Sequence, residues 1–356
     1  MKKFLLFPLL LVLCFGSRAE EPDGYYNKAL YKSRYELKES LYLIIKTHKQ
    51  REYSDLWDDY GETDTDQDGY IIDMYNDCNF VFKDNQCGSG SSGNAQNQCV
   101  CYNREHSVPK SWFNNQYPMY TDLFHLYPVS GYINSRRSNY PFGEVGDVTF
   151  TSTSGSKLGK SDFPGYTGTV FEPVDEYKGD FARTYFYMAT CYHNNVSTWN
   201  SDMFAKNNLD VFTDWAKELL LKWHRQDPVS EKETKRNDAV YGIQGNRNPY
   251  IDHPELVEKI WGDDTEPFGG EEPGDTTSVE TRFWGLCDLH INGRYVEVLY
   301  RGGSFDSAEI IDISGKRLCL ASVRQDRFGY RLPAAGVYIL RLCVGKKAYS
   351  KKIAVR

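Results

Sequence analysis

The sequence predicts an α+β protein, in which a domain rich in helices and loops is followed by a small antiparallel β-sandwich. Residues 209–225 carry apolar side chains at helical spacing, and residues 181–192 are apolar almost throughout, so both are expected to be helices. Later residues form short β-type runs at 295–300, 308–313 and 337–342, separated by turns. At 356 residues, the chain is too long for one ordinary core.

The first residues predict an exported protein. Lys2 and Lys3 precede a short apolar run that ends before Ala19, which is the pattern of a secretory signal over residues 1–19. No later segment approaches the roughly 20 apolar residues of a transmembrane helix. Eight cysteines remain after residue 19, an even number as a disulfide set requires, although their spacing leaves the pairing open. We therefore expect a secreted or cell-surface location in oxidising surroundings.

The charge is distributed unevenly between three segments. Residues 263–283 are rich in Gly, Pro, Asp, Glu and Thr and predict an acidic linker. Residues 284–356 hold 13 basic and 6 acidic residues, whereas the whole chain has a net charge of −7. The domain over residues 20–262 is therefore strongly acidic, which argues against a protein that holds nucleic acid through a broad basic surface. A polyanion would have to bind in a local cleft.

The most informative motif is a carboxylate beside an imidazole, Glu105-His106, followed later by Asn134 on a predicted short helix that ends near Pro141. Hydrolysis of a phosphodiester needs a hard cation, and Glu105 and the Asn134 amide offer two hard oxygen ligands for Mg²⁺. It also needs a base, and His106 titrates in the right range. Each residue alone has a structural explanation, since Asn134 could be a capping or surface residue.

Four arginines are candidates for holding phosphate. Arg136 and Arg137 follow Asn134, although they could form a solvated helix face. Arg183 lies in the aromatic helix and needs an anionic partner there, which could be phosphate or a site carboxylate. Arg247 precedes two prolines that suit a turn and a helix start, so it could serve the site or the local structure.

These motifs together resemble the endonuclease I family of secreted bacterial nucleases, which have a ββα-metal fold. Glu105 to Pro109 resembles the family's Glu-His-x-x-Pro segment, and residues 122–128 resemble its Asp-Leu-x-x-Leu-x-Pro strand. Asn134 with Arg137-Ser138-Asn139 follows, and the resemblance covers most of residues 25–262. Further matches lie at residues 171–173, 178–183, 244–249 and 252–255.

The resemblance implies a metal-dependent endonuclease that acts on DNA, with RNA as a second candidate substrate, and with little sequence specificity. It implies His106 as general base and Glu105 and Asn134 as ligands of one Mg²⁺, Mn²⁺ or Ca²⁺ ion. Arg183, in its aromatic helix, is a further catalytic candidate. Many members have His where this chain has Phe124, so a role of that ring is absent here.

A different class of function is also open. Asp64, Asp66 and Asp68, followed by Gly69, resemble the start of a calcium loop, although Tyr75 stands where an EF-hand has Glu. A polar turn is the alternative. With the high tyrosine content and the β-rich tail, a calcium site would suit a secreted adhesin or glycan-binding protein. A phosphatase-type metallohydrolase is a third candidate.

The tail resembles the C-terminal sorting domain of the type IX secretion system. The resemblance rests on residues 336–341 and on the run with paired lysines at 346–355. It implies that the secretion machinery is a partner and that the protein crosses an outer membrane. The alternative is a generic β-sandwich binding module.

Overall fold

The computed structural model describes residues 21–88, 97–208, 210–270, 283–321, 324–345 and 347–355. The α+β prediction is confirmed, because helices and small sheets form one hydrophobic core and an all-β segment forms another. The first core extends from Tyr26 to Phe268 and the second from Phe283 to Val355. The predicted signal segment lies outside the described residues. No helix within the described ranges is long and apolar enough to cross a bilayer.

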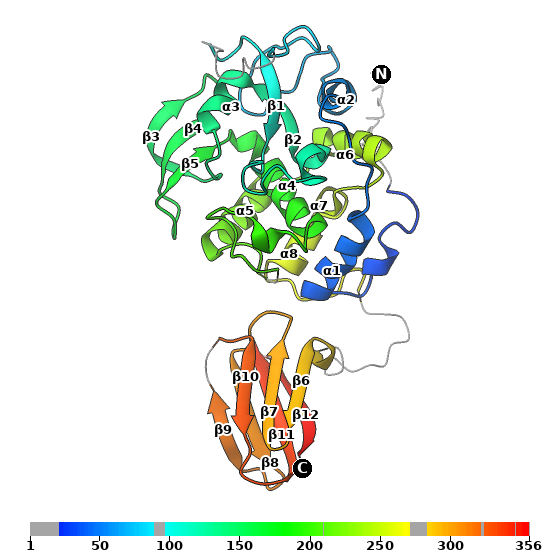
Figure 1. The fold of residues 1–356 in the computed structure, drawn as a ribbon, viewed down its shortest axis with the longest axis vertical. Coiled ribbons are helices and arrows are strands. Elements are labelled where there is room, and N and C mark those ends of the chain that lie inside the picture. Colours follow the sequence, from blue (N-terminus) through cyan, green and yellow to red (C-terminus); the bar gives the residue numbers. More distant parts are fainter. Residues whose placement is uncertain are drawn as a thin grey trace, which may run out of the picture.

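Helix α4, Lys178–Cys191, is the centre of the first core. All 14 of its residues are buried, which confirms the predicted apolar helix. Figure 1 shows it enclosed by other helices, and it contacts α1 (Arg34–Ile45), α5 (Asp214–Gln226) and α7 (Pro249–Asp252). The other helices of this domain are α2 (Leu56–Thr63), α3 (Gly131–Arg137), α6 (Glu231–Gln244) and α8 (Glu255–Ile260). Short 3₁₀ helices lie at Asn27–Ala29, Met119–Thr121, Leu123–His125, Asp175–Tyr177 and Val196–Thr198.

The predicted order of strand, loop, strand and short helix is also confirmed. Strand β1, Tyr102–His106, pairs antiparallel with β2, Leu126–Ser130, so that Glu105 lies opposite Tyr127. Helix α3 begins directly after β2 and lies against both strands. It ends at Arg137 rather than at Pro141, because Ser138 adopts a left-handed φ of 54°.

Helix α5 begins later than the apolar spacing predicted. The structure starts it at Asp214, not at residue 209, which itself is outside the described residues. Phe212 forms an antiparallel bridge with Phe204, and Thr213 has extended dihedral angles. Pairing with another segment therefore competes successfully with helix formation over these apolar residues.

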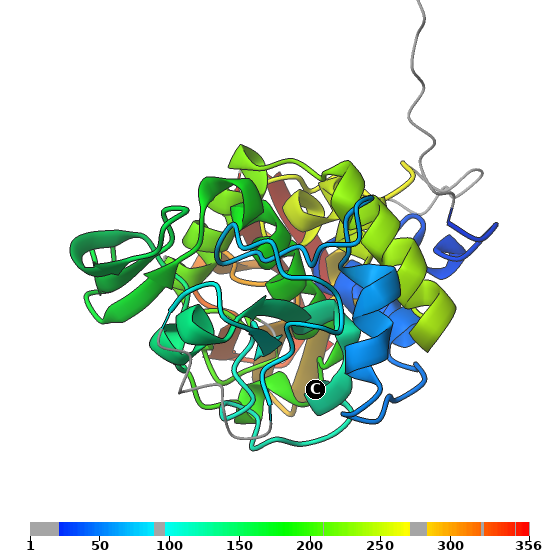
Figure 2. The same ribbon diagram turned by 90° about the horizontal axis from the view of Figure 1, so that it is seen from above.

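A three-stranded sheet projects from the helices on one side of the domain, as both ribbon views show (Figures 1 and 2). Its strands, in the order β3-β4-β5, are Val145–Thr151, Lys157–Ser161 and Thr169–Glu172. The outer face of β3 is largely exposed, whereas β5 is mostly buried against the helices.

The C-terminal segment forms two antiparallel sheets over a shared apolar core, as the sandwich prediction requires. One sheet has the order β10-β7-β6 and the other β12-β11-β8-β9. Each predicted run corresponds to a strand: the run at 295–300 matches at both ends, and the other two differ by one or two residues at their ends. The strands are Cys287–Asn292, Tyr295–Tyr300, Ser307–Asp312, Arg317–Ala321, Arg327–Arg331, Gly336–Val344 and Lys347–Val355.

Two disulfides flank the start of β1. They join Cys78 to Cys99 and Cys87 to Cys101. The remaining cysteines of the described residues are free, so the even number did not reflect four bonds. These are Cys191, Cys287, Cys319 and Cys343.

Candidate active site

Glu105 is buried at the contact between β1 and α3. Only 4% of its surface is exposed, and its Oε1 accepts hydrogen bonds from Arg137 Nη1 at 2.6 Å and Tyr75 Oη at 2.8 Å. Burial raises the pKa of the Glu105 carboxyl, and the Arg137 charge opposes that shift. Because both side-chain donors bind Oε1, no side chain of the described residues donates to Oε2, which suits a ligand oxygen.

Asn134, on α3, is held against β1 by a neighbouring amide. Its Nδ2 donates to Asn103 Oδ1 at 2.7 Å, so its own Oδ1 points elsewhere and remains an acceptor. Asn103 and Glu105 are two residues apart on β1 and therefore lie on one face of the strand, the face that α3 covers. One carboxylate oxygen and one amide oxygen at this contact fit a hard divalent cation such as Mg²⁺ or Ca²⁺.

His106 is the last residue of β1. One of its ring nitrogens is hydrogen-bonded, and the other has no partner among the described residues. Its Nε2 lies 3.0 Å from the backbone oxygen of Tyr120, so Nε2 carries the hydrogen and Nδ1 the lone pair. Nδ1 has no hydrogen-bond partner within the described ranges, and it is not among the fully enclosed unpaired atoms. Burial, with help from nearby His125, lowers the pKa of His106 well below its usual value. The ring is therefore a neutral base at neutral pH.

A group of rings and cations beside His106 escaped the sequence reasoning. Tyr53 and Tyr120 lie nearly parallel to the His106 ring, at centroid distances of 6.0 and 5.2 Å. Arg104 covers the Tyr53 ring at 3.7 Å, and Lys110 lies 5.4 Å from the Tyr120 ring. The only available signal was the alternation of β1, which places Arg104 on the same side of the strand as His106.

Three of the four arginines that are candidates for holding phosphate are bound to carboxylates, which for Arg183 was the alternative considered from the sequence. Arg137 pairs with Glu105, Arg183 with Glu233 through two bonds of 2.6 and 2.7 Å, and Arg247 with Asp252. All three arginines are at most 1% exposed. A buried guanidinium needs a compensating charge, and these carboxylates supply it.

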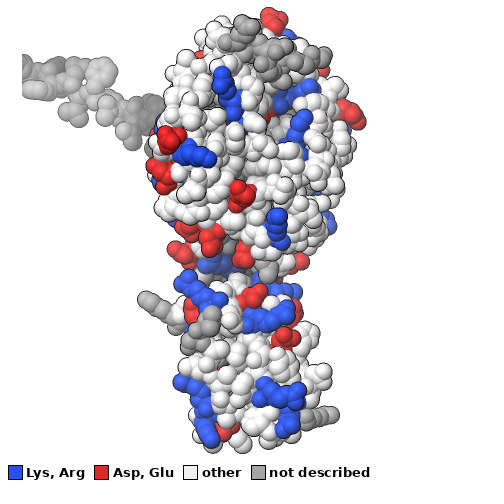
Figure 3. Space-filling model, turned by 60° about the vertical axis from the view of Figure 1, so that its left-hand side comes forward, with Lys and Arg blue, Asp and Glu red and all other residues white. Residues whose placement is uncertain are grey.

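Arg136 is the exposed member of the set. It stacks on Tyr132 and Phe150, at 5.0 and 5.5 Å from the ring centroids, on the outer side of α3. Figure 3 shows blue and red side chains interspersed over the visible face of the first domain, without a broad blue area. This distribution agrees with the charge of the sequence.

Two aspartates of the candidate calcium loop bind partners within the protein. Asp64 is turned inward, where Arg236 binds its carboxylate at 2.8 Å, and Asp66 Oδ1 accepts the backbone N–H groups of Asp68 and Tyr70. The three aspartates are not among the side-chain groups of the described residues that are close enough to share an ion. The hydrogen bonds of Asp66 are those of a polar turn, the alternative considered from the sequence, and a calcium site here stays a prediction.

One buried group does have metal-ligand spacing. The ligand atoms of His48, Asp122 and Cys191 lie within 4.8 Å of one another. Asp122 already accepts hydrogen bonds from Tyr187 and Tyr192 at 2.8 and 2.6 Å, so its charge is satisfied without an ion. We assign this group to the structure of the core.

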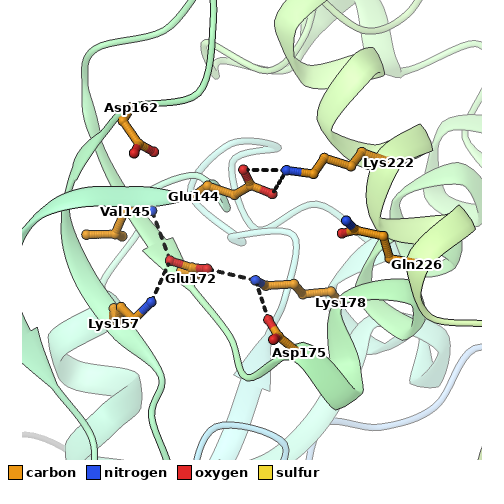
Figure 4. Close-up of a pocket in the computed structure, with 9 residues that line it drawn as sticks. All are labelled: Glu144, Val145, Lys157, Asp162, Glu172, Asp175, Lys178, Lys222 and Gln226. Atoms are coloured by element: carbon orange, nitrogen blue, oxygen red, sulfur yellow. Dashed lines mark hydrogen bonds and ion pairs between the residues drawn. The ribbon is translucent and has the colours of Figure 1, made fainter.

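A charged cavity of about 510 Å³ lies between the projecting sheet and helices α4 and α5. Figure 4 shows its side chains meeting in pairs, with Glu172 bound to Lys178 at 2.7 Å and Glu144 bound to Lys222 at 2.7 Å. Glu105, His106 and Asn134 do not line it. These pairs fasten the sheet to the helices, which explains two of the motifs noted in the sequence.

The hairpin and its covering helix carry a carboxylate, a histidine and an amide, the residue types that metal-dependent hydrolysis of a phosphodiester needs. The chain belongs to the Endonuclease I family, whose model matches residues 33–255. It is 34% identical over 247 residues to an extracellular ribonuclease of Bacillus amyloliquefaciens, covering 68% of this chain and 79% of that protein. A Bacillus subtilis extracellular ribonuclease is 33% identical over the same shares. A periplasmic deoxyribonuclease of Aeromonas hydrophila is 27% identical over 37% of this chain and 47% of its own.

Proposed function

We propose that this chain is an exported, metal-dependent endonuclease that hydrolyses phosphodiester bonds of DNA, and also of RNA, with little sequence specificity. The observation that carries the proposal is the His106 ring, which is held through Nε2 and has a free Nδ1, in the residue that follows Glu105 on β1. Family membership and the named ribonuclease and deoxyribonuclease relatives support both substrates.

His106 acts as general base in this proposal. Its Nδ1 takes a proton from the attacking water, while the Tyr120 carbonyl holds the ring in the tautomer with hydrogen on Nε2. Glu105 and Asn134 hold one divalent ion, Mg²⁺ or in its place Mn²⁺ or Ca²⁺. Such an ion neutralises charge on the phosphate and the leaving oxygen. Glu105 and His106 are neighbours on β1 and therefore point to opposite faces of the strand. A phosphate that contacts both the bound ion and the water activated by His106 therefore lies across the end of β1.

The exposed cations near the site hold the flanking phosphates. Arg136 remains our proposal for such a contact, and Arg104 and Lys110 are added to it from the structure. Arg137, Arg183 and Arg247 position neighbouring groups through their ion pairs. Contacts to phosphate carry no base information, which agrees with low sequence specificity.

Export and sorting are part of the same proposal. The two disulfides and the extracellular relatives support an exported protein. Residues 1–19 serve as signal, 20–262 as nuclease domain, 263–283 as linker and 284–356 as sorting domain for the type IX machinery. The observed two-sheet sandwich supports the last assignment.

Incubation of the purified mature chain with supercoiled plasmid and Mg²⁺ tests the activity. We expect nicking that stops with chelator and falls about 100- to 10,000-fold in His106→Ala. His290→Ala, an exposed histidine of the second domain, is the matched control and should be fully active. Undiminished cleavage by His106→Ala would contradict the assigned base. A phosphomonoester hydrolysed in place of plasmid would indicate a phosphatase, and polymer binding without turnover an adhesin.

A further inference from the structure

Aromatic rings from three separate segments gather at His106. Tyr53 precedes α2, Tyr120 lies in a 3₁₀ helix, and His106 ends β1. The Tyr53 and Tyr120 centroids are 4.7 Å apart with their planes 29° from parallel, and His106 is 26° from the plane of Tyr120. The three rings therefore share one orientation at the end of β1.

A fourth ring, that of Tyr117, stands at a steep angle to this stack, so that the rings form the two walls of a corner. Tyr117 lies 5.3 Å from Tyr120 with its plane at 67°, and 47% of its surface is exposed. Tyr53 and Tyr120 are half-buried, so their outer edges also reach solvent. A flat apolar ligand could stack on one wall of this corner while its edge contacts the other.

Two cations flank the rings without carboxylate partners. Arg104 lies between the rings of Tyr53 and Trp57, at 3.7 and 4.4 Å, and Lys110 is exposed beside Tyr120. Neither forms an ion pair with any carboxylate in the described part of the chain, in contrast to the buried arginines of this domain. Their charge is therefore available to the phosphates on either side of a stacked base.

We propose that Tyr53, Tyr117 and Tyr120 form a stacking site for one unpaired nucleobase next to the scissile phosphate, with Arg104 and Lys110 on the flanking phosphates. The inference rests on the proposed role of His106. Rings with interleaved cations are how proteins bind single strands without reading their sequence. A base in a duplex is already stacked on its neighbours and would have to be extruded. Unpaired DNA or RNA is thus the preferred substrate class.

The proposal is tested by removing the Tyr117 ring from the protein and the bases from the substrate, separately and together. We compare kcat/KM for a thymidine oligonucleotide, a uridine oligonucleotide and a sugar-phosphate chain of equal length without bases. In Tyr117→Ala, cleavage of the thymidine oligonucleotide should fall about tenfold. Cleavage of the baseless chain should be unchanged. The uridine arm shows whether the site takes bases of RNA as well as DNA.

Matched variants separate stacking from folding. Tyr117→Phe keeps the ring and should retain the wild-type rates, and Tyr140→Ala removes another exposed tyrosine and should also retain them. Equal losses on chains with and without bases, or no loss on either, would overturn the stacking site. A wild-type chain that cleaves none of the substrates would instead contradict the proposed nuclease function.

Discussion

Arg137 secures Glu105 from the helix that follows the hairpin: its Nη1 lies 2.6 Å from Glu105 Oε1 and 2.9 Å from the backbone oxygen of His106. Its Nη2 donates to the backbone oxygen of Ser107. One side chain therefore fixes the carboxylate, the backbone of the proposed base and the residue after it.

Replacement of Arg137 should damage both stability and activity. Arg137→Ala leaves the Glu105 carboxylate buried without its cation, which should lower the free energy of unfolding by about 3–5 kcal/mol. Arg137→Lys keeps the charge but loses part of the fork of hydrogen bonds, so its loss should be smaller. Urea unfolding measures both, with exposed Arg136→Ala as the control. Equal stability of Arg137→Ala and the wild type would refute this role.

Asn134 should affect how much metal the protein needs. In Asn134→Ala, the Mg²⁺ concentration that supports half-maximal cleavage should rise by about tenfold or more, because one of two protein ligands is lost. Asn103→Ala removes only the amide that orients Asn134 and should have a smaller effect in the same direction. Titrating the cleavage rate with Mg²⁺ measures both. Exposed Asn139→Ala is the control, and an unchanged titration of Asn134→Ala would exclude it as ligand.

The disulfide between Cys87 and Cys101 should support the site as well as the fold. It closes a loop of 14 residues beside β1, and a Cβ built on Gly131, the first residue of α3, would lie 2.6 Å from Cys87 Sγ. Replacing both cysteines by alanine should cost about 2–4 kcal/mol of stability. Cleavage should fall too, because β1 and α3 carry the site.

Unfolding and plasmid nicking, measured on the same preparation, check this prediction. Cys319→Ser removes a free cysteine of the second domain and should behave as the wild type. A double variant with full stability and activity would show that packing alone positions the hairpin.

Asp73 should make stability fall as the pH rises. Burial raises the pKa of its carboxyl to about 7, and its Oδ2 is enclosed without a hydrogen-bond partner in the described residues. The folded state therefore holds a proton that the unfolded chain releases near pH 4, so stability declines between about pH 4 and pH 7. Asp73→Asn removes this decline and should add about 1–2 kcal/mol near pH 8, with no gain near pH 4.

Thermal unfolding across this pH range measures the effect. Asp84→Asn changes an exposed carboxylate that is not among the charges acting on Asp73, and it should leave the pH profile unaltered. A loss of stability in Asp73→Asn near pH 8 would mean that the ionised carboxylate is stabilised in the folded protein.

Local patterns predicted much of the fold. The hairpin with its helix, the buried helix α4 and the strands of the sandwich were all predicted, because their hydrophobic period or turn residues act over short distances. The predicted start of α5 was wrong because Phe212 pairs with Phe204 instead of continuing an apolar helix face. The local pattern at Asp64 could not indicate that Arg236, far away in the sequence, binds its carboxylate.

The sequence by itself determined the family, the order of the Glu105, His106 and Asn134 motif and the change from mixed to all-β structure, since these depend on residue identity and spacing. Only the tertiary structure decided which arginines are neutralised, which nitrogen of His106 is open and which rings surround it. Those properties arise from packing between distant segments, as in the 2.6 Å contact of Arg183 with Glu233, 50 residues further along. Burial, which no local pattern specifies, decides whether a charged side chain meets substrate or another charge.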